Sequence, residues 1–213
     1  MFKVGPHQGQ PVLTAGEPLE TARAAMILVH GRGASAADIM TVASEVMFPG
    51  VVYLAPQAAG SAWYPNPFTA PLDSNEPYLS SALEVLSTIL VEVHDRLPAE
   101  KVLLLGFSQG ACLTLEFAAR NARRYGGVVG LSGGLIGPPG TPRDYPGDFA
   151  RTPVFLGCSD VDPYIPKERV IEAGQVFERM GADVTLRLYP GLAHTVSADE
   201  INEVRKIVEA VAT

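Results

Sequence analysis

Short apolar runs alternate with longer amphipathic stretches along almost the whole chain. The apolar runs predict strands at residues 25–30, 51–55, 102–107, 127–131, 153–157 and 184–188. The amphipathic stretches predict helices near residues 36–47, 77–97, 109–122, 166–180 and 197–211. Continuous apolar runs are typical of parallel strands buried on both faces. Their alternation with helices indicates an α/β fold, a mostly parallel sheet with helices on both faces.

Local signals mark several of these helices. Between residues 77 and 97 an apolar stripe repeats at spacings of three and four, as on the inward face of an amphipathic helix: Leu79, Leu83, Leu86, Leu90, Val93 and Leu97. Ser197 and Glu200 form the sequence pattern of a capping box, which predicts a helix start. Gly181 is expected to end the helix that reaches Met180.

The chemistry is concentrated where one apolar run turns sharply into a helix. Residues 106–110 read GFSQG and fit the G-x-S-x-G elbow, in which a serine takes a strained conformation between strand and helix. The flanking Gly106 and Gly110 let the two elements approach without a Cβ clash. Ser108 would then lie at a helix N-terminus, beside backbone N–H groups that can stabilise negative charge. We expect Ser108 to be a nucleophile.

A second match to the same pattern tests how much the context matters. Residues 130–134 read GLSGG, and they also follow an apolar run. The residues after Ser132 are rich in proline and glycine up to Pro142, which excludes a helix at this place. Ser132 is therefore expected to end a strand and not to act as the nucleophile.

A nucleophilic serine needs a base, and the chain has four histidines. His7 lies in an unpatterned segment and is expected at the solvated surface. His94 flanks the apolar stripe, which favours a polar role beside the core. His30 ends a strand, where a structural hydrogen bond is expected. His194 follows the last predicted strand in a loop, and strand-end loops carry the chemistry of such sheets, so we expect His194 to be the base.

Two carboxylates follow the strand at 153–157 and compete for the role of the acid. Both Asp160 and Asp162 lie between the serine and the histidine in the sequence. The order serine, acid, histidine is that of α/β-hydrolases. Asp144 and Asp148 precede the strand, and their Pro/Gly-rich surroundings predict a role in turns.

Seven segments in the same order over most of the chain resemble the phospholipase/carboxylesterase group of α/β-hydrolases, which includes the acyl-protein thioesterases. They are LVHGRG at 28–33, APQ at 55–57, WY at 63–64, GFSQG at 106–110, LSG at 131–133, DPYIP at 162–166 and YPGLAH at 189–194. The resemblance implies a single α/β-hydrolase domain over residues 1–213. It also implies Asp162 as the triad acid, because that family places Val or Ile and then Pro after the aspartate and two further residues. The family's usual spacing from the strand-end glycine, counted from Gly157, would instead select Asp160.

The resemblance further implies an oxyanion hole built from two backbone N–H groups. Its donors would be the amides of Arg32 and Gln109, in keeping with the general position of such donors in this fold. The Arg32 side chain is expected to be solvated at a loop tip, with attraction of an anionic substrate group as the alternative.

Long irregular segments at 57–76 and 133–152 could fold over Ser108. Candidates for an apolar wall around an acyl group are Trp63, Tyr64, Phe68, Tyr78 and Leu192, and each could instead only pack its loop onto the sheet. Neither segment is long enough for a separate cap domain. The expected pocket is open or shallow.

Composition narrows the function further. The 213 residues are 47% hydrophobic, which suffices for one substantial core. The net charge of −7 opposes binding to nucleic acid and to anionic membranes. No signal-like segment or long apolar run appears, so we expect a cytoplasmic protein without stable membrane insertion. Cys112 and Cys158 are expected to be reduced, and no metal ligands or cofactor motif are evident.

These observations together predict a carboxylesterase that forms an acyl-enzyme on Ser108, acts on a small-molecule ester or thioester, and needs no cofactor. The alternative enzymes are a thioesterase or a lysophospholipase for longer acyl chains. A non-catalytic binding protein on the same scaffold is a further alternative, since a fold alone does not fix function. A homodimer is left open.

Overall fold

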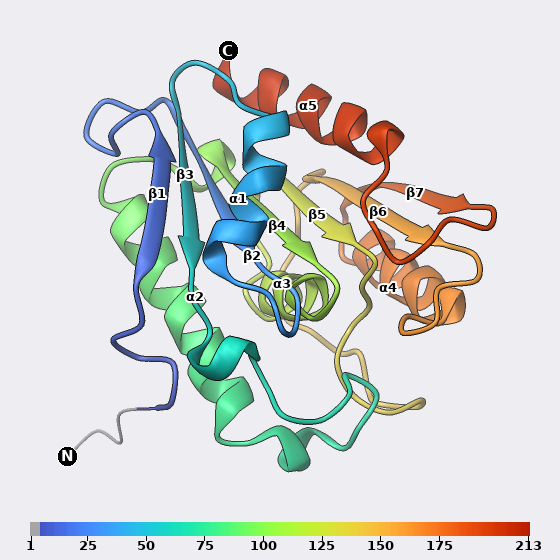
Figure 1. Cartoon of the computed structure of the whole chain (residues 1–213). Helices are drawn as coiled ribbons and strands as arrows, with labels where there is room; N and C mark the ends of the chain where they lie inside the picture. Colours follow the sequence, from blue (N-terminus) through green and yellow to red (C-terminus); the bar gives the residue numbers. More distant parts are fainter. Residues whose placement is uncertain (1–4) are drawn as a thin grey trace.

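The computed structural model describes residues 5–213 and shows one seven-stranded sheet at its centre (Figure 1). The strands are β1 (Val12–Gly16), β2 (Ala24–Val29), β3 (Val51–Pro56), β4 (Val102–Phe107), β5 (Gly127–Leu131), β6 (Pro153–Ser159) and β7 (Asp183–Tyr189). Their order across the sheet is β1-β3-β2-β4-β5-β6-β7. All six predicted strands are present, and β4 lies in the middle of the sheet.

The strands from β3 to β7 pair in parallel, and β1 pairs antiparallel with β3 at one edge. Sequence analysis missed β1. Four of its five residues are exposed, so this strand carries no apolar run that would have revealed it. The parallel strands β2 to β5, in contrast, are buried along almost their whole length, as their apolar runs predict.

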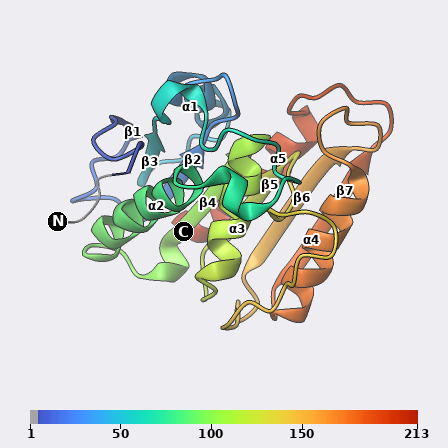
Figure 2. The same ribbon diagram turned by 90° about the horizontal axis from the view of Figure 1, so that it is seen from below.

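Helices cover both faces of the sheet, which confirms the predicted layers (Figure 2). They are α1 (Ala36–Glu45), α2 (Tyr78–His94), α3 (Gln109–Arg120), α4 (Lys167–Arg179) and α5 (Ala198–Ala212), with short 3₁₀ turns at Ala59–Ser61, Leu72–Asn75 and Ala99–Lys101. One core cluster joins the sheet to α2, α3 and α4, and the other joins it to α1 and α5. The site described below lies at the carboxyl edge of the sheet, between these two layers.

The helix ends follow the predicted signals. Ser197 accepts the backbone N–H of Glu200 while the Glu200 carboxylate accepts the Ser197 N–H, so the capping box is formed. Gly181 follows the end of α4 with φ of +80°, a conformation that glycine adopts without strain. In α2 the stripe is buried as predicted, except that Leu83 is only partly buried; the helix ends at His94, and Leu97 is buried beyond it.

The prediction that His7 lies at the solvated surface is wrong, because His7 is only 1% exposed. Its Nε2 lies 2.9 Å from the carbonyl oxygen of Trp63, and its Nδ1 accepts the N–H of Ala59 at 3.1 Å. Burial lowers the pKa of His7, so a neutral ring is favoured. His7 therefore connects the N-terminal segment to the loop after β3. Residues further along this loop form part of the cavity wall described below.

Candidate active site

Ser108 lies at the turn from β4 to α3, as the elbow pattern predicts. Its backbone has φ of 56° and ψ of −121°, a strained conformation for a residue with a side chain. A Cβ atom on Gly106 would collide with the carbonyl of Gly110, and one on Gly110 would collide with the carbonyl of Val29. Only glycine fits at both positions, so the sequence itself permits the sharp turn that presents the Ser108 hydroxyl.

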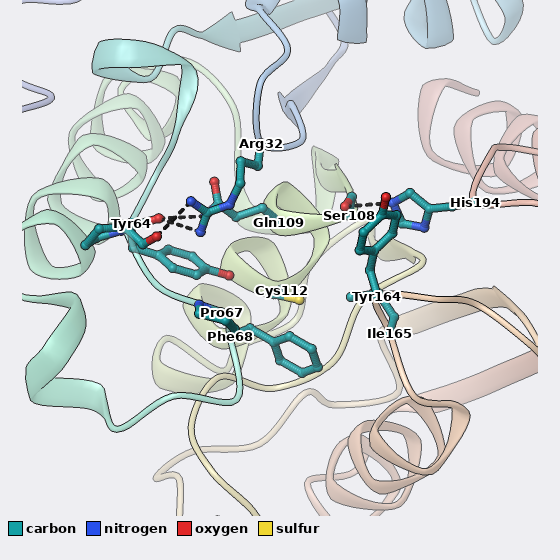
Figure 3. A pocket seen from close by; sticks show the side chains of 11 residues that line it. Arg32, Tyr64, Pro67, Phe68, Ser108, Gln109, Cys112, Tyr164, Ile165 and His194 are labelled. Carbon is teal, nitrogen blue, oxygen red and sulfur yellow. Dashed lines mark hydrogen bonds between the residues drawn. The ribbon is translucent and has the colours of Figure 1, made fainter.

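A chain of two hydrogen bonds connects Ser108, His194 and Asp162 (Figure 3 shows the first). Ser108 Oγ lies 2.9 Å from His194 Nε2, and His194 Nδ1 lies 2.6 Å from Asp162 Oδ2. A carboxylate can only accept, so Nδ1 carries the ring proton and Nε2 is left free to accept from the serine. The arrangement therefore favours the tautomer that a general base needs.

The Asp162 side chain is fully buried, and its surroundings keep it ionised. Burial by itself raises the pKa of this carboxyl, but hydrogen bonds from His194 and from the backbone N–H groups of Tyr164 and Ile165 outweigh burial, and the net pKa is lowered. Those two amides lie 2.9 and 3.0 Å from Oδ1. Oδ2 is thereby left for the histidine.

Asp160, the competing carboxylate, has a different partner. Its Oδ1 accepts the backbone N–H of Gly191 at 2.8 Å, in the loop that carries His194. Its own N–H donates to the carbonyl of Tyr189. Asp160 therefore connects the histidine loop to the end of β6, and Asp162 is the carboxylate that is bonded to His194.

The remaining serine and histidine candidates lie where the sequence predicts. Ser132 directly follows β5, is buried and has a positive φ of 53°, but an irregular segment and not a helix comes after it. His30 is fully buried at the end of β2, where its Nε2 accepts the N–H of Ala58 at 3.1 Å. His94 Nδ1 lies 3.2 Å from the carbonyl of Leu97. None of the three is part of the Ser108–His194–Asp162 chain.

Two amides close to Ser108 have no acceptor among the described residues. Gln109 is the first residue of α3, so its N–H cannot be paired within the helix. Arg32 follows β2 and its flanking glycine. Within residues 5–213 neither N–H is hydrogen-bonded to another loop, turn or side chain. Two free donors next to a nucleophile are what an oxyanion hole requires.

The Arg32 side chain is exposed, as its loop position suggested, but its guanidinium is also bonded to the protein. Its guanidinium donates to three successive backbone carbonyls, those of Tyr64, Pro65 and Asn66, each at 2.8 Å (Figure 3 draws part of this set). The Gln109 side chain binds the same segment, because its Oε1 accepts the Trp63 N–H and its Nε2 donates to the Tyr64 carbonyl. Sequence reasoning missed both contacts, since nothing in a local pattern shows which distant carbonyls an arginine will reach.

A cavity of about 690 Å³ opens beside Ser108 and His194. Its walls are mostly apolar, and they come from three loops and the first turn of α3: Arg32, Tyr64, Pro65, Pro67, Phe68, Gln109, Cys112, Tyr164 and Ile165. Figure 3 shows these side chains surrounding the space next to the serine. Tyr64 and Phe68 thus line the cavity, as the sequence suggested. Tyr164 does so too, is 68% exposed at its rim and was not foreseen.

Three of the suggested wall residues lie elsewhere. Trp63 is fully buried outside the cavity, and its indole N–H donates to the carbonyl of His30 at 2.8 Å. Tyr78 packs the edge of its ring against His7. Leu192 is half-buried in the histidine loop and does not line the cavity. Trp63 therefore packs its loop onto the sheet, which was the alternative for it, and Tyr78 contacts the N-terminal segment.

A buried ionic network connects α3 and α4 to the segment 133–152. Glu116 accepts the Ile136 N–H and the Tyr145 hydroxyl, and the Arg143 guanidinium lies between Glu116 and Glu172. Arg169 also binds Glu172 and lies 5.2 Å from the centre of the Phe68 ring. Movement of the segment 133–152 away from α3 would leave a buried charge without its partner, which is energetically costly. The network therefore holds this segment in place.

The described residues contain no cluster of three or more metal-binding side chains and no helix with the length and apolarity needed to cross a bilayer. Both cysteines are free and buried. Burial raises the pKa of the Cys112 thiol, which lines the cavity, to about 12. A protonated thiol is a poor nucleophile, so Ser108 is the reactive group that the geometry favours.

A parallel sheet with a strained serine at the elbow, and a histidine and an aspartate on later loops, defines an α/β-hydrolase. The family model described as phospholipase/carboxylesterase matches residues 13–212. The chain belongs to this phospholipase/carboxylesterase family, and it is a hydrolase of the esterase and thioesterase class.

Individual relatives agree with the family. Acyl-protein thioesterase 1 of Saccharomyces cerevisiae is 25% identical, over 92% of this chain and 96% of the yeast protein. The crystal structure of a phospholipase/carboxylesterase from Dyadobacter fermentans is 40% identical, covers 97% of this chain and superposes with a TM-score of 0.91. Acyl-protein thioesterase 2 of Zea mays, at 17% identity and a TM-score of 0.73, shares the fold.

Proposed function

We propose that the protein hydrolyses carboxylic esters through an acyl-enzyme on Ser108, with His194 and Asp162 as the other members of a catalytic triad. His194 Nε2 takes the hydroxyl proton while Ser108 Oγ attacks the carbonyl carbon. The N–H groups of Arg32 and Gln109 stabilise the oxyanion. His194 then gives the proton to the leaving oxygen, the bond to the alcohol breaks, and water releases the acid by the same steps.

The observation that carries this proposal is the hydrogen-bonded order of Ser108, His194 and Asp162 next to two unpaired amides. Each group alone has a structural explanation, but together they supply a nucleophile, a base in the required tautomer and donors for the developing charge. A binding protein on the same scaffold would not need a strained serine that is hydrogen-bonded to a histidine–aspartate pair.

The apolar cavity is proposed to take the acyl group of the substrate. Its walls at Tyr64, Phe68 and Ile165 suit a hydrocarbon chain. The second candidate is a thioesterase or lysophospholipase for longer acyl chains, which the names of the acyl-protein thioesterase relatives favour. The two buried free thiols are in keeping with a cytoplasmic location. A homodimer is retained as a proposal that sedimentation can test.

A fluorophosphonate probe tests the nucleophile without a choice of substrate. We expect mass spectrometry to find one modified residue, Ser108, and Ser108→Ala to lower kcat by about six orders of magnitude. Ser132→Ala is the matched control, because it removes the other serine of a G-x-S-x-G pattern. Labelling of Ser132, or full activity in Ser108→Ala, would contradict the proposal.

Ester and thioester activity are separated with four substrates that combine a short or a long acyl chain with an oxygen or a sulfur leaving atom. The proposed carboxylesterase hydrolyses the short oxygen ester with the highest kcat/KM. A preference for the long thioester would instead support the second candidate. Both outcomes keep Ser108 as nucleophile, so this experiment is independent of the probe experiment.

A further inference from the structure

His194 forms part of the wall of a second hollow, on the side away from the large cavity. This hollow has a volume of about 330 Å³ and lies between the first turns of α1 and the histidine loop. Its lining includes Gly31, Val42, Phe107, Thr195 and Val196. The catalytic imidazole therefore stands between two hollows.

The two hollows lie on opposite faces of the sheet. The large cavity is walled by Tyr64, Phe68, Cys112 and Ile165, which belong to the core cluster of α2, α3 and α4. The smaller hollow is walled by Ile39, Val42, Phe107 and Val196, which pack with the cluster of α1 and α5. Figure 2 shows α1 and the helices α2 to α4 on the two sides of the sheet. The elbow with Ser108 lies between them, at the carboxyl edge of the central strand β4.

This arrangement matches the stereochemistry of the tetrahedral intermediate. The attacked carbon carries the Ser108 oxygen, an oxyanion, the acyl group and the leaving group. The oxyanion points to the Arg32 and Gln109 amides, so the acyl and leaving groups must diverge from each other. If the acyl group lies in the large cavity, the leaving group is directed across His194. The leaving atom must also lie within reach of Nε2, which protonates it.

We propose that the hollow between α1 and the histidine loop binds the leaving alcohol or thiol of the substrate, and that it selects neutral, compact groups with an apolar surface. The proposal rests on the ester hydrolysis proposed above. The rim residues Thr41 and Thr195 of the hollow are exposed, so a longer leaving group can continue into solvent. The inner wall of the large cavity, at Phe68 and Cys112, is buried and suits a chain that ends there.

Gly31 lies in the wall of the hollow and next to Ser108. A Cβ atom at Gly31 would lie 3.4 Å from the Cβ of Ser108 and 3.5 Å from the Phe107 ring, so this wall of the hollow lies within van der Waals reach of the nucleophile's residue. The selectivity for charge comes from Asp38 at the rim. Hydrogen bonds from the Ser35 side chain and backbone lower the Asp38 pKa, so the carboxylate is ionised and repels an anionic leaving group.

Val42→Phe tests the proposal, because it adds bulk to the hollow at a residue that belongs neither to the triad and its two amide donors nor to the large cavity. The substrates are methyl butanoate, benzyl butanoate and methyl octanoate, which vary the leaving group and the acyl group separately. We expect kcat/KM for benzyl butanoate to fall about tenfold or more, the scale of steric discrimination in an apolar pocket. The values for both methyl esters should stay within twofold of wild type.

Phe68→Trp is the matched control for the other hollow, and it should lower kcat/KM for methyl octanoate while leaving the ratio of benzyl to methyl butanoate unchanged. The proposal is overturned if Val42→Phe lowers kcat/KM for methyl octanoate and not for benzyl butanoate, or if it lowers kcat/KM for both butanoates equally. If the wild-type enzyme hydrolyses none of the three esters, the proposed function fails and the question of the subsite does not arise.

Two further measurements keep the test decisive if Val42→Phe folds poorly. Val42→Ala enlarges the hollow and should raise kcat/KM for benzyl relative to methyl butanoate. The two butanoates also share one acyl-enzyme, so a leaving-group site predicts altered acylation with an unchanged deacylation rate in rapid-quench experiments. A changed deacylation rate would count against the proposal.

Charge selectivity is tested with the para-carboxylate analogue of benzyl butanoate at low ionic strength. Wild type should hydrolyse this anion several-fold more slowly than the neutral ester, and Asp38→Asn should reduce the difference. Asp95→Asn removes one exposed carboxylate far from the hollow and is the control for net charge. Equal effects of both variants would show that only the overall charge matters and would contradict a role of Asp38.

Discussion

Asp162→Asn tests the histidine tautomer, and the structure dictates how the new amide must lie. Asp162 Oδ1 accepts two backbone N–H groups, from Tyr164 and Ile165. In asparagine only the carbonyl oxygen can accept, so that oxygen must stay with these two donors. The NH₂ group then takes the place of Oδ2 and points at His194 Nδ1, 2.6 Å away in the native contact. Nδ1 must now accept, and the ring proton moves to Nε2.

A histidine protonated at Nε2 cannot take the proton of Ser108. We therefore expect kcat/KM to fall about 10⁴-fold, as in other triads with this change. The loss corresponds to about 5 kcal/mol of transition-state stabilisation. Asparagine is close to isosteric with aspartate, and both backbone donors keep their acceptor, so the fold should be preserved.

Hydrolysis of p-nitrophenyl butanoate measures the effect, and circular dichroism checks the fold. Asp160→Asn is a matched control, two residues away on the same loop, because its amide oxygen can still accept the Gly191 N–H. It should retain activity within a few-fold of wild type. A ¹⁵N spectrum of the imidazole should show the proton on Nδ1 in wild type and on Nε2 in Asp162→Asn. A large loss in Asp160→Asn with little loss in Asp162→Asn would refute the assignment.

Two further predictions concern the support of the site. Arg32→Ala removes three hydrogen bonds to the segment 64–66. We therefore expect kcat/KM to fall about tenfold and amide hydrogen exchange of this segment to accelerate. The control is Arg23→Ala, in which another exposed arginine loses its hydrogen bond to the Pro49 carbonyl, and it should change neither quantity. Burial raises the pKa of Glu200, so the folded state holds this proton to higher pH than the unfolded state, and stability is lost as pH rises through the two pKa values. Glu200→Gln should therefore flatten the decline of the unfolding free energy between pH 4 and pH 8 in urea titrations, and an unchanged slope would contradict the role of Glu200.

The parts of the fold that carry a local physical signal could be predicted. The strands β2 to β5 are buried on both faces, so nearly all of their residues are apolar and each strand is visible in the sequence as an apolar run. The elbow could be predicted for a similar reason. Its geometry tolerates only glycine at positions 106 and 110, two residues before and two residues after Ser108. The helix after it requires good helix formers.

Contacts between distant loops could not be predicted in this way. Nothing near His7 indicates that its ring will meet the backbone of residues 59 and 63, more than fifty positions away. Strand β1 is exposed at the sheet edge, so it has no buried face to impose a pattern. The choice between Asp160 and Asp162 is a further case. Both follow the same strand, and only the path of the loop decides which one reaches His194.

Arg32 shows why these unpredicted contacts matter for the chemistry. Its amide is one proposed donor to the oxyanion, and its guanidinium holds the carbonyls of the segment that carries Tyr64 and leads to Phe68. Gln109 repeats this double role, with an amide beside Ser108 and a side chain bonded to the backbone at Trp63 and Tyr64. The two amides and the acyl wall are therefore fixed to each other by the same two residues. A displacement of the wall by a poorly fitting acyl chain would also displace the donors, so acyl selectivity should be expressed in kcat as well as in KM.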